Sequence, residues 1–335
     1  MTPHAVTGDD VTDDVRLEVD DLSVVFDLPT GKLVAVDGVS YRLVGGRTLG
    51  VVGESGSGKS VTALALLRLL PPRATITRGR VLWRDQDLTR LPDAALRGVR
   101  GRHLSLVFQD PMGALNPAMT VGAQVAESLR LHEDVSSQAA QDGAVAWLGR
   151  VGLPDPGRQA RFYPHELSGG MRQRVTIAIA LACRPEILIA DEPTTALDVT
   201  VQARILDLLL DLQDELGLAL QFISHNLAVV SEIADAIAVM YAGTIVELGP
   251  AALLLEDPRH PYTRALLAAV PRPGSRRPPE PIAGAPPLHG ARGTGCLYAD
   301  RCPLVVAECR VQRPTLGAYG DDARRVACWR AAVSA

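Results

Sequence analysis

A glycine-rich turn at residues 53–60 has the residue types that bind phosphate. It fits the spacing G-x-x-x-x-G-K-[ST], and its residues are Gly53, Glu54, Ser55, Gly56, Ser57, Gly58, Lys59 and Ser60. The glycines let backbone N–H groups point inward around a phosphate. Lys59 brings positive charge to the β and γ phosphates, and the Ser60 hydroxyl suits Mg²⁺. The turn therefore predicts a site for a nucleoside triphosphate and Mg²⁺.

An acidic pair later in the chain has the chemistry that would act on such a substrate. Asp191 and Glu192 follow the apolar run 187–190, which has the pattern of a buried strand. That strand would fix Asp191 where it can hold hydrated Mg²⁺, and Glu192 could polarise an attacking water. An acidic strand end also occurs in solvated turns and helix caps. Because the phosphate-binding turn lies in the same chain, we expect hydrolysis of the triphosphate.

A pair of glycines opens a predicted helix within the run Leu167-Ser168-Gly169-Gly170-Met171-Arg172-Gln173-Arg174. Ser168 suits the N-cap, and the two glycines allow another backbone to approach closely, so the helix N-terminus is a second anion site. At this run the sequence resembles the ATP-binding cassette (ABC) ATPases, whose signature it matches. The resemblance implies ATP as the nucleotide and a head-to-tail dimer. The residues that would act on ATP bound to the partner are Ser168, Gly169, Gly170 and Gln173.

The resemblance also assigns a Mg²⁺ ligand set. Gln109, which follows the apolar run 104–108, resembles the Q-loop glutamine of the family, which reaches both Mg²⁺ and water. The implied Mg²⁺ ligands are therefore Ser60, Gln109 and Asp191.

Two further positions match the family one by one. Asp198 resembles the D-loop aspartate, which touches the opposing subunit, and His225 resembles the switch histidine, which contacts the γ-phosphate. The implied catalytic set is thus Glu192, His225 and Gln109. Phe26 is a candidate for stacking on adenine, but it could equally be an apolar strand residue, because the loop at 27–34 could shift the register.

The elements that must position these residues alternate between strand-like and helical patterns. Strand-like apolar runs occupy residues 17–26, 39–44, 49–52, 187–190, 219–223 and 236–240. A helical run at 60–70 directly follows the phosphate-binding turn, and residues 111–182 are mostly helical. These patterns predict an α/β fold. With the resemblance, we expect a P-loop ABC ATPase core with an antiparallel β subdomain and a helical insertion.

Composition shifts predict the domain boundaries. Residues 1–14 are acidic and are expected to form a flexible tail, and residues 15–260 are expected to form the ABC ATPase domain, with its helical subdomain at about 111–182. Residues 261–335 are expected to form a small C-terminal extension, in which a proline-rich connector at 271–287 leads to the cysteine-bearing segment 296–328.

Four of the five cysteines lie in this extension, at Cys296, Cys302, Cys309 and Cys328. Four thiolates suit a [4Fe–4S] cluster or Zn²⁺, although the gaps are wider than the C-x2-C pairs of structural zinc sites. Tails with this spacing resemble those of iron–sulfur binders. We therefore expect a [4Fe–4S] cluster that staples a segment with few apolar residues; Zn²⁺ and unligated thiols are the alternatives.

The residues between the motifs resemble one branch of the family, the oligopeptide/dipeptide/nickel importer ATPases. The matching runs are Phe108-Gln109-Asp110-Pro111-Met112 and His260-Pro261-Tyr262-Thr263-Arg264-Ala265-Leu266-Leu267. The resemblance implies an ATP-hydrolysing importer subunit that powers uptake of di- or oligopeptides by ATP-driven dimer closure. Nickel or another small solute is the alternative cargo, and a soluble ABC ATPase acting on ribosomes or DNA is a rival that we favour less.

The net charge and the hydropathy of the chain limit the classes of partner that it could bind. The chain has 335 residues, with 34 Lys and Arg against 38 Asp and Glu, and this net charge of −4 argues against nucleic acid. No apolar run is long enough to span a membrane. The resemblance therefore implies two transmembrane permease subunits, a second ABC ATPase, identical or related, and an external solute-binding protein. It places the chain peripherally, on the cytoplasmic face of the cell membrane.

Overall fold

The computed structural model describes residues 14–195, 197–270, 280–287, 293–320 and 323–332. The predicted acidic tail, apart from residue 14, lies outside the described residues. The chain divides into two compact units. The first unit comprises Met1–Val44, Thr48–Thr89 and Phe222–Ala335, and the second comprises Gly45–Arg47 and Arg90–Gln221.

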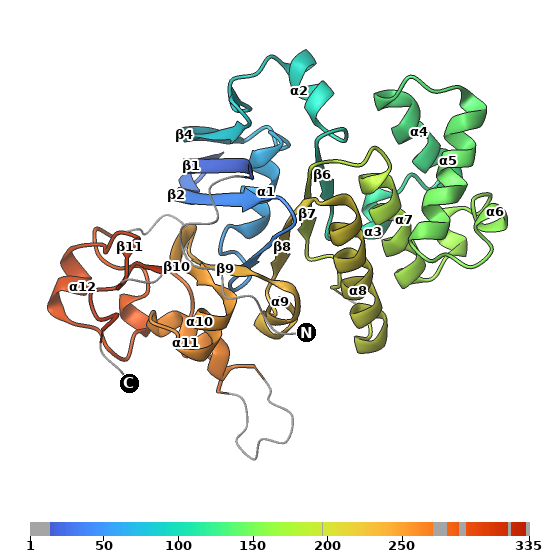
Figure 1. Ribbon diagram of the computed structural model, residues 1–335. Helices are drawn as coiled ribbons and strands as arrows, with labels where there is room; N and C mark the ends of the chain where they lie inside the picture. The colour runs from blue at the N-terminus through green and yellow to red at the C-terminus, as the bar shows by residue number, and fades with distance from the viewer. Residues whose placement is uncertain (1–13, 196, 271–279, 288–292, 321–322, 333–335) are drawn as a thin grey trace. The chain divides into compact units, whose positions relative to one another are not determined.

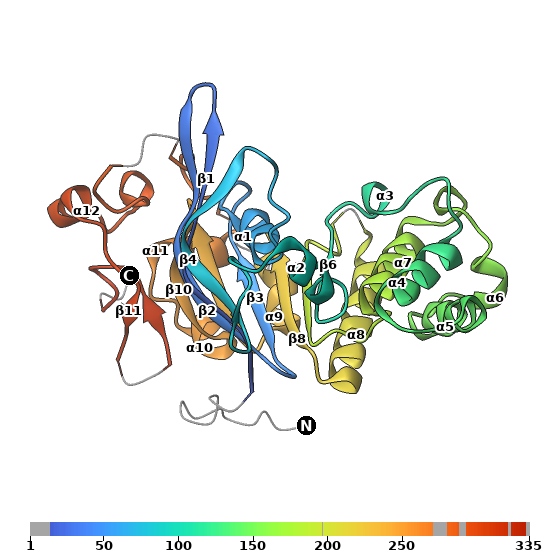
Figure 2. The ribbon, with the colours of Figure 1, turned by 90° about the horizontal axis from the view of Figure 1, so that it is seen from above.

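The first unit contains an antiparallel sheet in the order β2-β1-β4-β5. The strands are β1 (Val15–Leu28), β2 (Gly31–Val44), β4 (Ala74–Trp83) and β5 (Gln86–Asp87). β1 and β2 form the long hairpin that Figure 2 shows, and their register runs from Val15 opposite Val44 to Leu28 opposite Gly31. Alternate side chains such as Leu17 and Val19 are buried, which is the expected period of a strand with one face on a core.

A second group of strands in this unit follows the order β11-β12-β10-β9-β3. β3 (Thr48–Val52) is fully buried and lies parallel to β9 (Ala236–Tyr241), whereas β10 (Thr244–Pro250) is antiparallel to β9. β11 (Gly317–Ala318) and β12 (Arg325–Val326) continue the order. The helices of the unit are α1 (Lys59–Leu66), α9 (Leu227–Ile233), α10 (Ala251–Glu256), α11 (Pro261–Ala268) and α12 (Ala307–Val311), with the 3₁₀ helix η2 (Ala299–Arg301).

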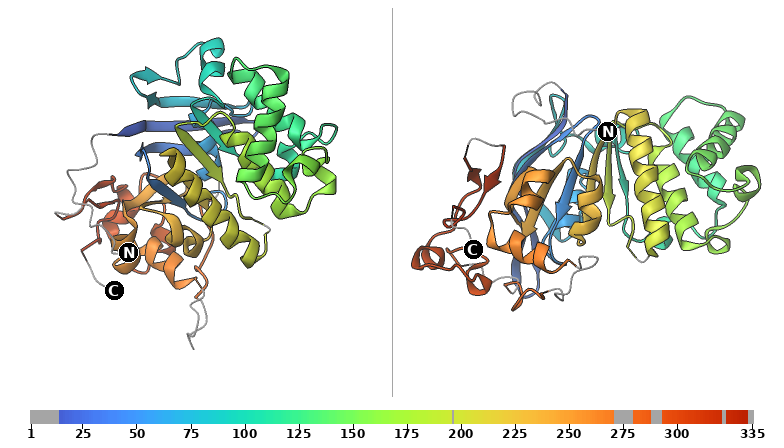
Figure 3. Two further views of the ribbon diagram at one scale, coloured as in Figure 1. Left: turned by 45° about the vertical axis from the view of Figure 1, so that its right-hand side comes forward. Right: turned by 60° about the horizontal axis from the view of Figure 1, so that its bottom comes forward.

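The second unit is helical around a short parallel sheet. β6 (Leu104–Val107) pairs in parallel with β7 (Ile187–Asp191), and the boundary between the units passes through β8 (Ala219–Ser224). The helices are α2 (Asp93–Val99), α3 (Pro111–Ala114), α4 (Val121–His132), α5 (Ser137–Arg150), α6 (Pro156–Gln159), η1 (Pro164–Glu166), α7 (Gly169–Leu181) and α8 (Val199–Leu216). The green helices α4 to α7 pack together in both views of Figure 3. Val125 on α4, Leu148 on α5 and Val175 on α7 are all buried, as expected for the apolar faces of packed helices.

An aromatic cluster ties the C-terminal segment to the rest of the first unit. The buried rings of Tyr241 on β9, Tyr262 on α11 and Tyr298 lie with their centroids 4.6 to 5.4 Å apart. Such tilted aromatic pairs contribute beyond their buried area, on the order of 1 kcal/mol each. The segment drawn in red in Figure 1 is therefore packed on the first unit through its own side chains.

A buried polar junction starts α11. The Glu247 carboxylate on β10 accepts hydrogen bonds from the backbone N–H groups of Arg259 and His260, at 2.8 and 2.9 Å. The Nδ1 atom of His260 in turn accepts the backbone N–H of Tyr262 at 3.0 Å. His260 is 1% exposed, and this burial lowers its pKa to about 3. Burial also raises the pKa of Glu247. The imidazole is therefore a neutral acceptor that caps the helix.

Candidate nucleotide-binding site

The predicted phosphate-binding turn joins β3 to α1 in the first unit. Gly58 is the residue before α1 and has a φ of 101°, a left-handed conformation that glycine adopts at little cost. A Cβ at Gly58 would lie 2.6 Å from the carbonyl oxygen of Ala35, and a Cβ at Gly53 would overlap the carbonyl oxygen of Met240. Both positions therefore exclude any side chain, which explains the glycines at positions 53 and 58.

Lys59 spans this turn. Its Nζ donates to the backbone carbonyls of Gly53 at 2.8 Å and Glu54 at 3.0 Å, and the residue is only 5% exposed. The backbone N–H of Ser57 also donates to the Glu54 carbonyl, at 3.1 Å. These bonds hold the ammonium group over a closed loop that opens directly into a helix, as phosphate binding requires.

The acidic strand end and the glutamine lie together in the second unit. Asp191 ends β7 and is 8% exposed, and Glu192 follows with a φ of 47°, a left-handed conformation that is unusual for glutamate. The Nε2 of Gln109 donates to Oε2 of Glu192 at 3.3 Å. The structure thus brings together two of the three residues predicted to be catalytic.

One residue near Glu192 was missed by the sequence analysis. Thr195 Oγ1 donates to the same Oε2 atom at 2.8 Å, so the carboxylate has two donors on one oxygen. Ser and Thr hydroxyls form local hydrogen bonds in turns, but no sequence pattern pointed from Thr195 to the Glu192 carboxylate. Thr195 therefore belongs with the candidate site as the residue that orients the carboxylate.

The signature run and the D-loop also pack within the second unit. Ser168 is the N-cap of α7, and Asp198 is the N-cap of α8, accepting the backbone N–H of Val201 at 2.9 Å. A Cβ at Gly170 would lie 2.6 Å from a methyl group of Val201, so the two helix starts approach as closely as glycine permits. Gln173 is 2% exposed, and its side chain packs inside the unit.

Phe26 and His225 both lie in the first unit. Phe26 is half-buried on β1, opposite Leu33 on β2 and Ala74 on β4, so the structure fixes the register that the sequence left open. His225 is exposed and directly follows β8. The contact of either residue with a nucleotide stays a prediction.

The four cysteines of the C-terminal segment line one small cavity of about 10 Å³. All are free thiols, and burial raises the pKa of Cys328 to about 11 and raises the pKa values of Cys296 and Cys302. Within the described residues, no group of three or more His, Cys, Asp or Glu side chains is arranged to hold a metal ion. The predicted [4Fe–4S] or Zn²⁺ site at Cys296, Cys302, Cys309 and Cys328 is therefore not supported.

A family model described as ABC transporter matches residues 36–195, and a second, described as oligopeptide/dipeptide transporter, C-terminal region, matches residues 246–309. The chain is 47% identical over 317 residues to the dipeptide transport ATP-binding protein DppD of Bacillus subtilis, covering 93% of this chain and 94% of that one. The chain belongs to the ABC transporter family. A probable peptide ABC transporter ATP-binding protein of Sinorhizobium fredii is 47% identical over 321 residues, covering 95% of each chain.

Solved ABC structures share the fold. The ATP-binding cassette MJ0796, in a dimeric post-hydrolysis state bound to ADP and Pi, matches with a TM-score of 0.64 and 27% identity, covering 70% of this chain and 98% of that one. CbiO1 of Clostridium perfringens, part of the ABC transporter complex cbiONQ, matches with a TM-score of 0.62 and 25% identity, covering 73% and 92%. These matches confirm the predicted fold class, and this ABC chain is an ATPase. Among the described residues, no helix is both long enough and apolar enough to cross a membrane.

Proposed function

We propose that this ABC ATPase powers the import of di- or oligopeptides through partner permeases. The observation that carries the proposal is the similarity to a dipeptide transport ATP-binding protein over 93% of the chain. The match of residues 246–309 to the C-terminal region of oligopeptide/dipeptide transporters supports the same branch. We propose the corresponding domains: a cassette at 15–260 with its helical subdomain at about 111–182, and an extension at 261–335.

The ATP would be held and hydrolysed by the residues named above. The N–H groups of residues 53–60 and the Lys59 ammonium bind the phosphates, and Phe26 stacks on adenine. Ser60, Gln109 and Asp191 hold Mg²⁺, which neutralises charge on the phosphate oxygens. Glu192, oriented by its two donors, accepts a proton from the attacking water, and His225 contacts the γ-phosphate.

The signature run at the start of α7 would act on ATP bound to the partner ATPase and not on ATP bound to this chain. The residues proposed to act on the γ-phosphate bound by a second ABC ATPase lie at the start of α7, and they are Ser168, Gly169, Gly170 and Gln173. Asp198 touches the opposing subunit. ATP binding closes this dimer, and hydrolysis reopens it, so that the chemical step is coupled to movement of the permeases.

The proposed assembly comprises two permeases, two ABC ATPases and an external solute-binding protein, with this chain peripheral on the cytoplasmic face of the membrane. No metal site in the extension is part of the proposal, because within the described residues no group of three or more His, Cys, Asp or Glu side chains is arranged to hold a metal ion.

The test is a pull-down from native membranes in detergent, with a tagged Glu192→Gln variant, Mg²⁺ and ATP, read by mass spectrometry. Slow hydrolysis should trap the closed complex, so we expect two permeases and one or two ATPase species. The matched control is Glu215→Gln, which alters a largely exposed carboxylate paired with Arg150 on the outside of α8. It should recover less of the complex.

Two outcomes would overturn the proposal. Recovery of ribosomes or nucleic acid without membrane proteins would leave only the ATPase activity. If the transporter is recovered but cells take up labelled Ni²⁺ and not a labelled dipeptide, the protein would be a nickel importer ATPase and not a peptide importer ATPase.

A further inference from the structure

A glutamate in the phosphate-binding turn is clamped by an arginine from the C-terminal extension. Nη1 of Arg301 lies 2.6 Å from Oε2 of Glu54, and Nη2 lies 2.9 Å from Oε1. The two residues are 247 positions apart in sequence. The Arg301 side chain is 4% exposed, and that of Glu54 is 26% exposed. A buried, bidentate ion pair of this kind is strong and directional, because both hydrogen bonds join charged groups.

The same glutamate is fixed through its backbone. The Glu54 N–H donates to Oη of Tyr262 on α11 at 2.9 Å, and the Glu54 carbonyl accepts from Nζ of Lys59 at 3.0 Å. The C-terminal region therefore holds the peptide on one side of Glu54, while the peptide on the other side orients the lysine that binds phosphate. The Glu54 backbone thus contacts both Tyr262 and the Lys59 ammonium.

Arg301 is itself held in place. Its Nε donates to the carbonyl of Ala283 at 2.8 Å, and its Nη1 lies 3.3 Å from Oη of Tyr241. The guanidinium also lies over the rings of Tyr241 and Tyr298, at 5.7 and 5.8 Å from their centroids. The Glu54 ion pair raises the pKa of Arg301 further above its ordinary value, so the residue stays charged. Arg301 is thus held by Ala283, Tyr241 and Tyr298 as well as by Glu54.

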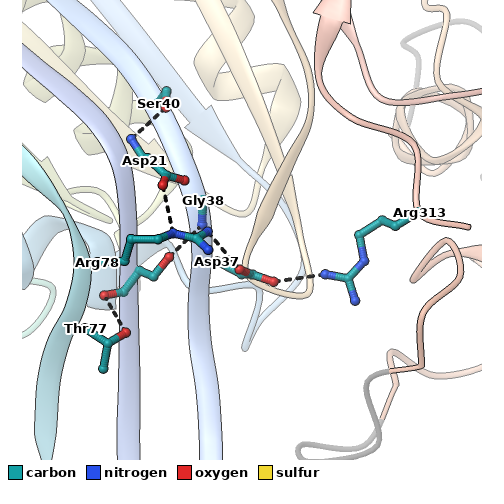
Figure 4. Close-up of polar contacts among 8 residues, drawn as sticks. Asp21, Asp37, Gly38, Ser40, Thr77, Arg78 and Arg313 are labelled. Carbon is teal, nitrogen blue, oxygen red and sulfur yellow. Dashed lines mark hydrogen bonds and ion pairs between the residues drawn. The ribbon is translucent and has the colours of Figure 1, made fainter.

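A second connection reaches the other end of the turn. Figure 4 shows Asp37 of β2 between Arg78 of β4 and Arg313 of the extension, and Nη1 of Arg313 lies 2.9 Å from Oδ2 of Asp37. The Asp37 N–H donates to the Gly243 carbonyl at 2.8 Å, and the Gly243 N–H donates to the Ser57 carbonyl at 2.8 Å. The extension therefore contacts the phosphate-binding turn directly at Glu54 and, through two backbone steps, at Ser57.

The charge of Glu54 needs this arrangement. A carboxylate in a turn that binds a triphosphate repels the ligand unless a cation cancels its charge. We propose that Arg301 is a positioning residue for ATP: it neutralises Glu54 and, with Tyr262, holds the turn in its phosphate-binding shape. The C-terminal extension then sets the affinity of the cassette for the phosphates of ATP. This inference rests on residues 53–60 binding ATP, as proposed above.

The test is titration of the full-length chain with a fluorescent ATP analogue and Mg²⁺. Arg301→Gln leaves the Glu54 carboxylate unpaired, so we expect about tenfold weaker binding. Glu54→Gln alone should weaken binding less, since it leaves no unpaired negative charge. The double variant Glu54→Gln/Arg301→Gln should recover most of the affinity lost in Arg301→Gln. A role confined to folding the extension would not produce this recovery.

The control and the second variant keep the test decisive. Arg310→Gln removes the exposed ion pair with Asp300 in the same extension and should bind like the wild type. If Arg301→Gln does not fold, Tyr262→Phe removes the acceptor of the Glu54 N–H and should weaken binding several-fold. Wild-type affinity in Arg301→Gln, or equal losses in the single and double variants, would overturn the inference. A wild-type chain that binds no ATP would instead reject the proposed site itself.

Discussion

Thr195 and Gln109 both donate to Oε2 of Glu192, at 2.8 and 3.3 Å. Two donors on one carboxylate oxygen leave the side chain little freedom to rotate. Because the backbone of Glu192 is also held at a left-handed φ of 47°, the carboxylate is oriented from both its ends. A general base must have such a fixed orientation before water arrives.

Removal of the Thr195 hydroxyl should therefore slow hydrolysis without preventing ATP binding. We expect Thr195→Val to lower kcat about tenfold, which corresponds to the loss of one hydrogen bond to a charged group. Thr195→Ser keeps the hydroxyl and should restore most of the rate. Steady-state phosphate release by the assembled transporter measures both. Equal rates in Val and Ser variants would show that the hydroxyl has no part in orienting Glu192.

Glu192→Gln should retain ATP binding and hydrolyse ATP at least about a hundredfold more slowly, because the amide cannot accept the proton of the attacking water. The measurement is a pair of assays, ATP-analogue titration and phosphate release. Glu215→Gln, on the exposed face of α8, serves as the control and should keep normal turnover. Near-normal turnover in Glu192→Gln would remove this residue from its catalytic role.

Gly170→Ala should disturb the start of α7, because the added methyl group would lie 2.6 Å from Val201. We expect a loss of about 2 kcal/mol in the free energy of unfolding, as for other overpacked contacts, together with lower ATPase activity. Val201→Ala makes room and should rescue both in the double variant. Gly157→Ala is the control, since a Cβ there meets nothing within 4 Å. Chemical denaturation of each variant gives the comparison, and an unstable double variant would contradict the contact.

Acid should destabilise the protein through His260. Its folded pKa of about 3 lies below the unfolded value near 6.5, so the unfolded chain binds the extra proton first. Stability due to this group is complete above pH 6.5 and falls as pH falls toward 3, by about 2 kcal/mol at pH 5. The raised pKa of Glu247 acts in the opposite sense.

The measurement is the free energy of unfolding from pH 7 to pH 5. His260→Asn keeps an acceptor for the Tyr262 N–H without a titrating ring, and it should flatten the pH dependence. His165→Asn alters an exposed histidine and should leave the slope unchanged. An unchanged slope in His260→Asn would show that other groups control the acid sensitivity.

Local patterns predicted much of this architecture. The turn at 53–60 was predicted to lie between a strand and a helix, and the structure has β3 before it and α1 after it. The acidic pair was predicted to end a buried strand, and β7 ends at Asp191. The segment 111–182 was predicted to be mostly helical, and its helices begin at side chains that favour N-caps, such as Thr120 and Ser136.

Three features could not be predicted from the sequence: the ion pair between Glu54 and Arg301, the spatial arrangement of the four cysteines, and the register of Phe26. No residue near Glu54 in the sequence indicates a partner 247 positions away, so the ion pair with Arg301 is evident only from the tertiary structure. For the four cysteines, spacing gives the number of thiols and not their arrangement in space, and the metal site predicted from it is not supported by the described residues. Phe26 was ambiguous for a third reason: a hairpin register depends on the turn, which single-sequence patterns fix poorly.

The pairing of Glu54 with Arg301 also limits how this protein can be cut and recombined. A fragment that ends after α11 would keep every motif of the cassette but leave a negative charge at its phosphate-binding turn. In a chimera with a foreign C-terminal region, the glutamate and the arginine would have to be exchanged together. The smallest fragment that can be transferred intact must therefore include both Glu54 and Arg301, and it is larger than the segment that contains the ATP-binding motifs.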